Sequence, residues 1–454
     1  MQPAATHPLV TVFVLALCIR LVNLALLSGN DSFFAELDTV AYWSTGAKMA
    51  APGGVPATFL EITDRTPVYP LLLGAMRRAF GDAPRLVALV QAAVDAGTCT
   101  LIAALGALIS PRVGLISGII AALSVTLIVF STQILTETLF LFFFTATLLA
   151  GAHYLRSPTL GLAVLAGVAG GLALGTRTAV APMLAAAVPL VFVVAMVRRR
   201  GFATALAAAA LFAVATAAPI TPMLARNVLH YGHFSLSSQA GDHLAFWIVP
   251  LVAQRADGTP YQVTVDRLEG RYQQALTARG LPADANPFLR SAVTAEIARD
   301  EMARLPPAAF AKAWLEGMAV NLGAPALLAD PRVRALPKPS FYNAPGASLW
   351  EKTRAYVFDD PGRYQLLLVA GLLATLPFLV LAAVGFVMLA RTLPWAAVFA
   401  GGVLAYFLLL NGPIATAKYR MPMEPVLIVL AAIPLARLTQ RVGWAKSPPE
   451  PVQH

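Results

Sequence analysis

Separated runs of apolar residues dominate this chain of 454 residues. An α-helix needs about 20 apolar residues to cross a hydrocarbon core about 30 Å thick. Runs close to that length predict an all-α polytopic membrane protein with about ten transmembrane helices. The ten runs are Pro8–Ser28, Arg85–Ile109, Val113–Phe130, Thr138–Leu155, Leu160–Gly175, Ala179–Val197, Gly201–Met223, Tyr364–Ala390, Leu393–Leu410 and Pro425–Leu438.

The composition excludes an ordinary soluble protein. Residues of the set AVILMFWYC make up 58% of the chain and charged residues 12%, against about 45–50% and 25% in soluble domains. The net charge of +10 does not indicate nucleic-acid binding, because no basic run is longer than Arg198–Arg200. The two cysteines, Cys18 and Cys99, both lie in apolar runs, so neither a disulfide framework nor a cysteine-based metal site is expected.

The basic residues predict the orientation in the membrane. With a cytoplasmic N-terminus, the inner loops and the C-terminal tail carry positive charge opposed only by Glu450, as the positive-inside rule requires. These basic residues are Arg112, Arg156, Arg198, Arg199, Arg200, Arg391, Arg437, Arg441 and Lys446. We therefore expect a multi-pass protein of the bacterial plasma (inner) membrane, with its chemistry on the periplasmic side.

Three units follow from this topology. Residues 1–224 form a transmembrane module whose first outer loop, 29–84, is predicted to be catalytic. Residues 225–363 form a small α-rich extracytoplasmic domain with surface-lying helices such as Glu296–Ala324. Residues 364–454 form a C-terminal transmembrane module with a cytoplasmic tail.

Ionisable residues gather on the outer face. The first outer loop carries Asp31, Glu36, Asp38, Asp64 and Arg65 next to apolar runs. Further ionisable residues lie at the outer ends of other runs: Glu137, Arg177, Arg226, Lys418 and Arg420. A solvated loop with arginines that anchor helices in the headgroup layer is the simplest interpretation. Convergence on one face also favours a site for an anionic lipid headgroup.

The order of these motifs resembles the GT-C membrane glycosyltransferases, namely the relatives of protein O-mannosyltransferases and of the lipid A aminoarabinose transferase (glycosyltransferase family 39-like). Asp38 and Tyr42 match an Asp-x-x-x-Tyr pattern in the first outer loop. Arg65 precedes a proline-led apolar segment, Glu137 opens a later run, and Tyr419–Pro425 leads into the last one. Two features depart from the family: Thr39 stands where many members have Glu, and Arg65 stands where aminoarabinose transferases have Lys.

The resemblance implies sugar transfer from a polyprenyl-phosphate donor to a hydroxyl of a glycolipid, polysaccharide or protein acceptor. Asp38 is the predicted general base, with Glu137 as its rival or as a group that orients the acceptor. Arg65 is expected to stabilise the leaving phosphate, assisted by Arg420, Arg226 or Arg177. The remaining predicted substrate-binding residues are Tyr42, Asp64, Tyr69 and Tyr419. No cofactor is required; a divalent metal beside Asp31, Glu36 and Asp38 is compatible with the sequence but not indicated by it.

Three alternatives stay open at this point: a ligase acting on lipid-linked oligosaccharide, a transporter or flippase of lipid-linked sugars, and a non-catalytic assembly subunit. A transporter is expected to carry several charged residues deep in its spans, whereas here they are chiefly Arg20 and Asp95. No nucleotide-binding, serine-hydrolase or zinc-protease motif is present in the sequence.

Three smaller features carry structural expectations. Arg20 and Asp95 lie at similar depths in neighbouring spans, which predicts a buried ion pair. Gly167, Gly171 and Gly175 form a stripe that favours close helix packing within the chain over dimerisation. The histidines His230, His233 and His243 cluster in sequence, but their intervals are not typical of metal ligands.

Overall fold

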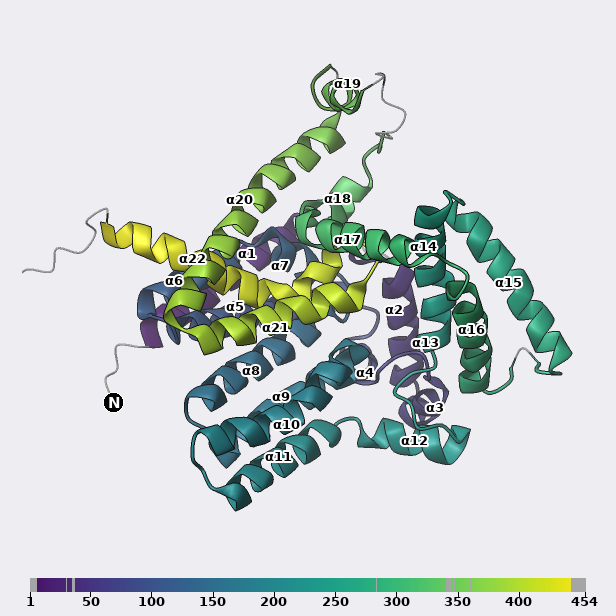
Figure 1. Cartoon of the computed structure of the whole chain (residues 1–454), viewed down its shortest axis with the longest axis horizontal. Coiled ribbons are helices and arrows are strands. Elements are labelled where there is room, and N and C mark those ends of the chain that lie inside the picture. The colour runs from purple at the N-terminus through teal and green to yellow at the C-terminus, as the bar shows by residue number, and fades with distance from the viewer. Residues whose placement is uncertain are drawn as a thin grey trace, which may run out of the picture.

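The computed structural model describes residues 6–29, 31–34, 37–282, 284–339, 345, 348–359 and 361–441. The regular elements in this part of the chain are all helices, as the sequence predicts, and no strand occurs among them (Figure 1). The start of α1, the first described helix, lies at one end of a bundle of long helices, and the helices formed by residues 240–302 lie beyond its opposite end (Figure 1).

Every predicted apolar run forms a helix or a pair of helices. They are α1 Thr6–Ala25, α5 Pro84–Ala107, α6 Pro111–Leu123 with α7 Val125–Ser131, α8 Glu137–Arg156, α9 Leu160–Thr176, α10 Ala181–Val197, α11 Phe202–Ala217 with α12 Thr221–Tyr231, α20 Arg363–Thr392, α21 Pro394–Asn411 and α22 Glu424–Arg441. Among the described residues, seven helices are long and apolar enough to cross a membrane, and the two pairs raise the number to nine if each is one span. Helix α9 is apolar but shorter, so the count of ten spans stays a prediction.

The third predicted span is broken rather than continuous. Helices α6 and α7 meet at Ser124 with a bend of 50°. Ser124 has an extended conformation, and its side-chain oxygen accepts a hydrogen bond from the backbone N–H of Leu127, which caps α7. The apolar composition continues across Ser124, so hydropathy alone did not predict this break.

The seventh predicted span is broken as well. Helix α11 ends at Ala217, and α12 starts at Thr221 after a bend of 63°. Pro219 and Pro222 flank the bend, and a proline lacks the N–H that a helix interior requires. The predicted run Gly201–Met223 therefore covers α11 and the first residues of α12, not one continuous helix.

The first outer loop folds into three helices: α2 Leu37–Ala50, α3 Gly54–Glu61 and α4 Val68–Phe80, preceded by the 3₁₀ turn η2 Asp31–Phe33. Helices α2 and α4 cross closely, because a Cβ atom on Gly46 would lie 2.7 Å from Leu73 Cβ and one on Gly74 would lie 2.7 Å from Met49 Cβ. The segment after Arg65 is thus a short helix, as its proline-led apolar pattern predicts, and it is held firmly against α2.

The glycine stripe on α9 packs within the chain. A Cβ atom on Gly167 would lie 2.7 Å from the carbonyl oxygen of Phe212 on α11, and one on Gly171 would lie 2.5 Å from the carbonyl oxygen of Thr216 on the same helix. Gly175 meets Val68 at the start of α4. The stripe therefore serves close intramolecular packing, as predicted, and it brings the C-terminal end of α9 against the first outer loop.

Residues 240–359 form a set of shorter helices. They are α13 Ala240–His243, the π-helical turn η4 Leu244–Ile248, α14 Val249–Ala256, α15 Tyr261–Ala278, α16 Pro287–Met302, α17 Pro307–Gly323, the 3₁₀ turn η5 Ala326–Ala329, α18 Pro331–Arg334, α19 Leu349–Arg354 and the π-helical turn η7 Ala355–Asp359. Helices α15 and α16 share an apolar core with η4, at residues such as Leu268, Val293 and Ile297. The predicted amphipathic piece Glu296–Ala324 is two helices, α16 and α17.

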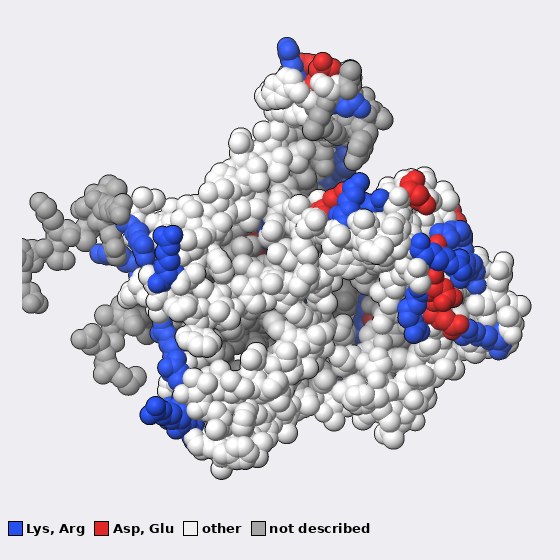
Figure 2. All heavy atoms as spheres, viewed as in Figure 1, with Lys and Arg blue, Asp and Glu red and all other residues white. Residues whose placement is uncertain are grey.

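Charge is distributed unequally over the surface in Figure 2. At the end of the bundle where the chain begins, the visible charged side chains are all basic. Around the helices of residues 240–359, acidic and basic side chains are mixed. The sides of the bundle between these regions are almost free of charge, as expected for a surface in contact with lipid (Figure 2).

Candidate active site

An acidic side chain from the first outer loop lies between two cations from different parts of the chain. Asp38 is in the first turn of α2; one of its carboxylate oxygens lies 3.5 Å from Arg65 Nη2 and the other 3.6 Å from Lys418 Nζ. Lys418 belongs to the 3₁₀ helix η8 Ala417–Met423, which leads directly into α22. The Asp38 side chain is 52% exposed, whereas those of Arg65 and Lys418 are only 16% and 14% exposed. The carboxylate is therefore accessible, and both cations are largely shielded from water.

Two tyrosines, Tyr42 and Tyr69, pack next to Arg65 and hold it in place. The Arg65 guanidinium lies 4.8 Å from the centre of the Tyr42 ring, and Tyr42 packs edge-to-face on Tyr69 at 5.3 Å. The Tyr69 hydroxyl donates a hydrogen bond of 2.7 Å to Gln91 of α5. Burial, opposed by Arg65 and Arg177, raises the pKa of Tyr42 to about 12. Tyr42 is therefore a neutral phenol at physiological pH.

A second ion pair lies beside the first. Glu137, the first residue of α8, is buried and pairs with Arg177, which follows α9. Arg177 also lies 5.8 Å from the ring of Phe140. This pair interacts electrostatically with the Asp38 group. The Tyr42 hydroxyl interacts with both Arg177 and Arg65, and the Glu137 carboxylate interacts with Lys418. We call Asp38, Tyr42, Arg65, Glu137, Arg177 and Lys418 the outer cluster.

Two of the four arginines predicted to bind the donor phosphate, Arg226 and Arg420, bind backbone carbonyls and do not belong to the outer cluster. Arg226 of α12 donates to the carbonyls of Phe59 and Ile62, which lie at the C-terminal end of α3. Arg420 of η8 donates to the carbonyls of Leu322 and Ala324, at the C-terminal end of α17, and to Glu424 at 2.8 Å. Both guanidinium groups are buried, and they satisfy helix-terminal carbonyls that have no partner within their own helix. Each therefore has a structural role in this conformation.

The same arrangement recurs at other arginines. Arg85 donates to Leu24 at the end of α1, and Arg198 donates to Leu155 at the end of α8. Arg65 and Arg177 differ, because in the described part of the chain their guanidinium groups contact carboxylates and aromatic rings. Of the predicted phosphate-binding residues, these two have guanidinium groups that an incoming anion would not have to separate from a helix end.

The remaining predicted residues take lesser positions. Asp64 lies 3.5 Å from Arg65, and its backbone carbonyl accepts a hydrogen bond from Ser237, so it helps to fix the segment that carries Arg65. The Tyr419 ring lies 6.0 Å from Lys418 Nζ. Glu36 and the side chain of Asp31 lie outside the described residues, and the described part of the chain contains no group of three or more His, Cys, Asp or Glu arranged for a metal ion.

The clustered histidines contact aromatic rings. His233 stacks on Phe288 at 5.4 Å, His230 packs against Tyr231 at 4.7 Å, and His243 stacks on Trp247 at 6.5 Å. Because each ring has its own aromatic neighbour, the three do not form a common site among the described residues.

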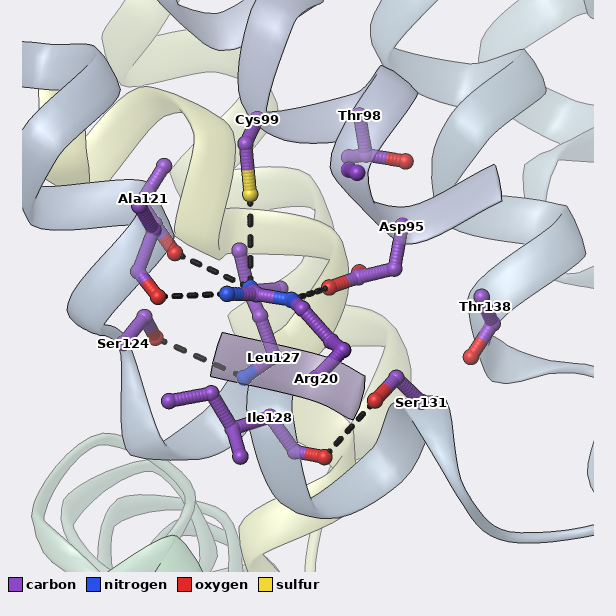
Figure 3. Close-up of polar contacts among 12 residues, drawn as sticks. Arg20, Asp95, Thr98, Cys99, Ala121, Ser124, Leu127, Ile128, Ser131 and Thr138 are labelled. Carbon is purple, nitrogen blue, oxygen red and sulfur yellow. Dashed lines mark hydrogen bonds and ion pairs between the residues drawn. The ribbon is translucent and has the colours of Figure 1, made fainter. Parts of the chain in front are cut away.

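The predicted buried pair of Arg20 and Asp95 is present (Figure 3). Arg20 Nε lies 2.7 Å from Asp95, and neither side chain is exposed. The other nitrogens of Arg20 donate to the carbonyls of Ala121 and Ala122 and to Cys99 Sγ. Ala121 and Ala122 are at the end of α6, so the break at Ser124 supplies the acceptors that a buried guanidinium needs.

Lys418 is the member of the outer cluster for which no specific role was predicted. It was visible as one of several cations at outer helix ends, but nothing in its neighbourhood predicted contact with Asp38. The pairing of Glu137 with Arg177 was likewise not predicted. Both contacts join segments that are distant in sequence, so only the packing of the helices reveals them.

Comparison with known proteins supports the resemblance seen in the motifs. Residues 64–224, about a third of the chain, match the family model of dolichyl-phosphate-mannose-protein mannosyltransferases. This segment contains Arg65, Tyr69, Glu137 and Arg177, but not Asp38 or Lys418. Over this segment the chain is therefore similar to a family of membrane mannosyltransferases.

A comparison with curated protein sequences gave no match. Among solved structures, the chain is similar to ArnT from Cupriavidus metallidurans bound to undecaprenyl phosphate, at 16% sequence identity and a TM-score of 0.36. The similarity covers 96% of this chain and 79% of that one.

Proposed function

We propose that this protein is a membrane glycosyltransferase that moves a sugar from a polyprenyl-phosphate donor to an acceptor hydroxyl on the extracytoplasmic face. The observation that carries the proposal is the accessible Asp38 carboxylate between the shielded cations Arg65 and Lys418. Such a transfer needs a base for the acceptor proton and positive charge for the leaving phosphate, and the outer cluster places both within one group of side chains.

In the proposed reaction, the oxygen of the acceptor hydroxyl attacks the anomeric carbon of the sugar, and the Asp38 carboxylate takes the proton of that hydroxyl. The bond between that carbon and the phosphate oxygen breaks, and the prenyl phosphate leaves with the bonding electrons. Arg65 and Lys418 neutralise the charge that develops on the phosphate. A guanidinium offers two parallel N–H donors to phosphate oxygens, whereas an ammonium acts as a point charge.

The Glu137–Arg177 pair supports this arrangement from the side. Glu137 is buried and already occupied by Arg177, so it is less suited than Asp38 to receive a proton from an acceptor. Arg177 is partly exposed and donates to no backbone carbonyl of the described residues, which leaves it available as a third cation for the donor. We therefore assign Glu137 the positioning of Arg177 rather than base catalysis.

The test is a transfer assay with purified protein, radiolabelled prenyl-phosphate sugar and an envelope extract as the source of acceptors. Transfer releases free prenyl phosphate and moves the label to an acceptor, which we expect to observe. Reconstituted vesicles in which the labelled donor changes leaflet without release of prenyl phosphate would instead indicate a transporter. Dependence on a lipid pyrophosphate donor would indicate a ligase.

A further inference from the structure

An open cavity of about 620 Å³ lies at the N-terminal end of α20, away from the residues of the outer cluster. Among the described residues, the cavity is lined by the segment after α18 and by the start of α20. The lining residues are Leu336, Pro337, Lys338, Pro339, Gly362, Arg363, Tyr364 and Gln365. The lining contains two cations and no acidic side chain. Within the described part of the chain, neither Lys338 nor Arg363 forms an ion pair, so the cavity presents positive charge.

The helix end adds to this charge. Helix α20 begins after Gly362 without a side-chain cap, and its first-turn N–H groups are not satisfied within the helix. The N-terminus of a helix also carries the positive end of the helix dipole. Lys338, Arg363 and the start of α20 therefore favour the same kind of ligand, an anion.

A buried amide gives independent evidence for a ligand. Gln365 lines the cavity and is only 7% exposed, yet its side-chain oxygen Oε1 has no hydrogen-bond partner in the described part of the chain. An unpaired buried acceptor destabilises the folded protein. A ligand that carries a hydroxyl donor beside its anionic group would provide the missing partner.

The position of the cavity indicates a lipid. Helix α20 is a long candidate membrane span that slants away from the rest of the bundle, with α19 beyond its N-terminal end (Figure 1). Below the cavity, Leu366, Leu373 and Val380 are exposed at seven-residue intervals, so they lie on one face of the helix. On the other side of the cavity, Tyr356 donates to the carbonyl of Pro339, and the neighbouring Phe358 is exposed. Aromatic side chains are typical of the membrane–water interface.

We propose that this cavity binds the phosphodiester headgroup of an anionic glycerophospholipid, with the acyl chains along the exposed face of α20. Lys338, Arg363 and the N-terminus of α20 hold the phosphodiester, and a headgroup hydroxyl donates to Gln365. This lipid is neither donor nor acceptor in the proposed transfer reaction, because no residue of the cavity belongs to the outer cluster. It is a second, separate lipid site.

The experiment is a titration of the delipidated full-length protein in neutral detergent with dioleoylphosphatidylglycerol, followed by native mass spectrometry. Dioleoylphosphatidylcholine is the neutral comparison lipid. We expect the double variant Lys338→Ala/Arg363→Ala to bind the anionic lipid about tenfold or more weakly. The matched control is Arg304→Ala/Lys312→Ala, which removes the same charge from exposed positions around the start of α17 and is expected to bind normally. Equal loss in both double variants, or equal binding of the two lipids, would overturn the proposal.

Two further measurements distinguish a lipid site from a phosphate site and from a structural defect. Inorganic phosphate and glycerol 3-phosphate are titrated as competitors; displacement of the lipid by either at a similar concentration would assign the cavity to a soluble phosphate. Gln365→Leu removes a buried unpaired group, so we expect a higher melting temperature without lipid and a smaller rise when phosphatidylglycerol is added. An unchanged lipid-dependent rise would remove Gln365 from the site.

Discussion

Two ion pairs of the same chemical type serve different purposes in this molecule. Arg20 and Asp95 are 2.7 Å apart and fully buried, and the rest of the Arg20 guanidinium is used by carbonyls at the end of α6. Arg65 and Asp38 are 3.5 Å apart, and the carboxylate is half exposed and shared with Lys418. The closed pair, Arg20 and Asp95, is shielded from solvent, and its guanidinium is held by protein acceptors. The open pair, Arg65 and Asp38, has a half-exposed carboxylate, so an incoming anion can reach it.

The same contrast separates the arginines of the outer face. Arg226 and Arg420 bind backbone carbonyls at helix ends, as Arg20 does. Arg65 and Arg177 instead contact carboxylates and aromatic rings of the described residues. Whether a guanidinium satisfies a helix end is therefore a structural criterion that separates arginines with a packing role from those suited to bind a substrate.

The largest expected effect is a loss of stability when the closed pair is broken. Arg20→Ala leaves the Asp95 carboxylate buried without its partner, and we expect it to lower the free energy of unfolding by about 3–5 kcal/mol. The measurement is thermal and denaturant unfolding of the purified protein in detergent. The double variant Arg20→Met/Asp95→Leu is the control and should lose less than the single variant, because no unpaired charge remains. A double variant that loses the sum of the two single losses would show that the two side chains do not act as a pair.

The next largest effect is expected on turnover, when the carboxylate of the open pair is changed. Asp38→Asn keeps the size of the side chain but removes its basicity, so we expect turnover to fall by about 10²-fold or more with little change in unfolding temperature. The transfer assay measures this directly. The matched control is Glu61→Gln, a carboxylate of the same loop that pairs with Lys48 on the surface and should leave the rate unchanged. A parental rate in Asp38→Asn together with no transfer in Glu137→Gln would move the base to Glu137.

A further prediction concerns the affinity for the donor when the cation of the open pair is changed. Arg65→Ala removes a shielded cation, and we expect donor affinity to fall by about tenfold or more. Arg65→Lys should restore part of this loss, because it returns the charge without the two parallel N–H donors. Arg78→Ala, an exposed position on α4, the helix that follows Arg65, is the control. Equilibrium binding of a labelled prenyl phosphate to the folded variants gives the comparison, and unchanged affinity in Arg65→Ala would exclude it from the donor site.

The sequence predicted the parts of this molecule that depend on local pattern. Apolar run length gave the positions of the long helices, and depth along two runs predicted the pairing of Arg20 with Asp95. The bend at Ser124 was not predicted, because one serine does not interrupt an apolar run and helical propensity is only a weak guide. The contact of Asp38 with Lys418 was not predicted either, because it depends on how η8 and α2 pack in three dimensions.

The smallest expected effect tests how Arg65 is supported. Tyr42→Phe keeps the ring below the guanidinium and removes only the hydroxyl, so we expect donor affinity to change by no more than about twofold. Tyr42→Leu removes the ring and the cation–π interaction, worth about 0.5–1 kcal/mol, and should weaken binding by a factor of about 2–5. The raised pKa of Tyr42, about 12, keeps its phenol protonated from pH 6 to 9, so its ionisation contributes no pH dependence to turnover in that range. Equal losses in Tyr42→Phe and Tyr42→Leu, measured in the same binding assay, would instead mean that the hydroxyl contacts the substrate.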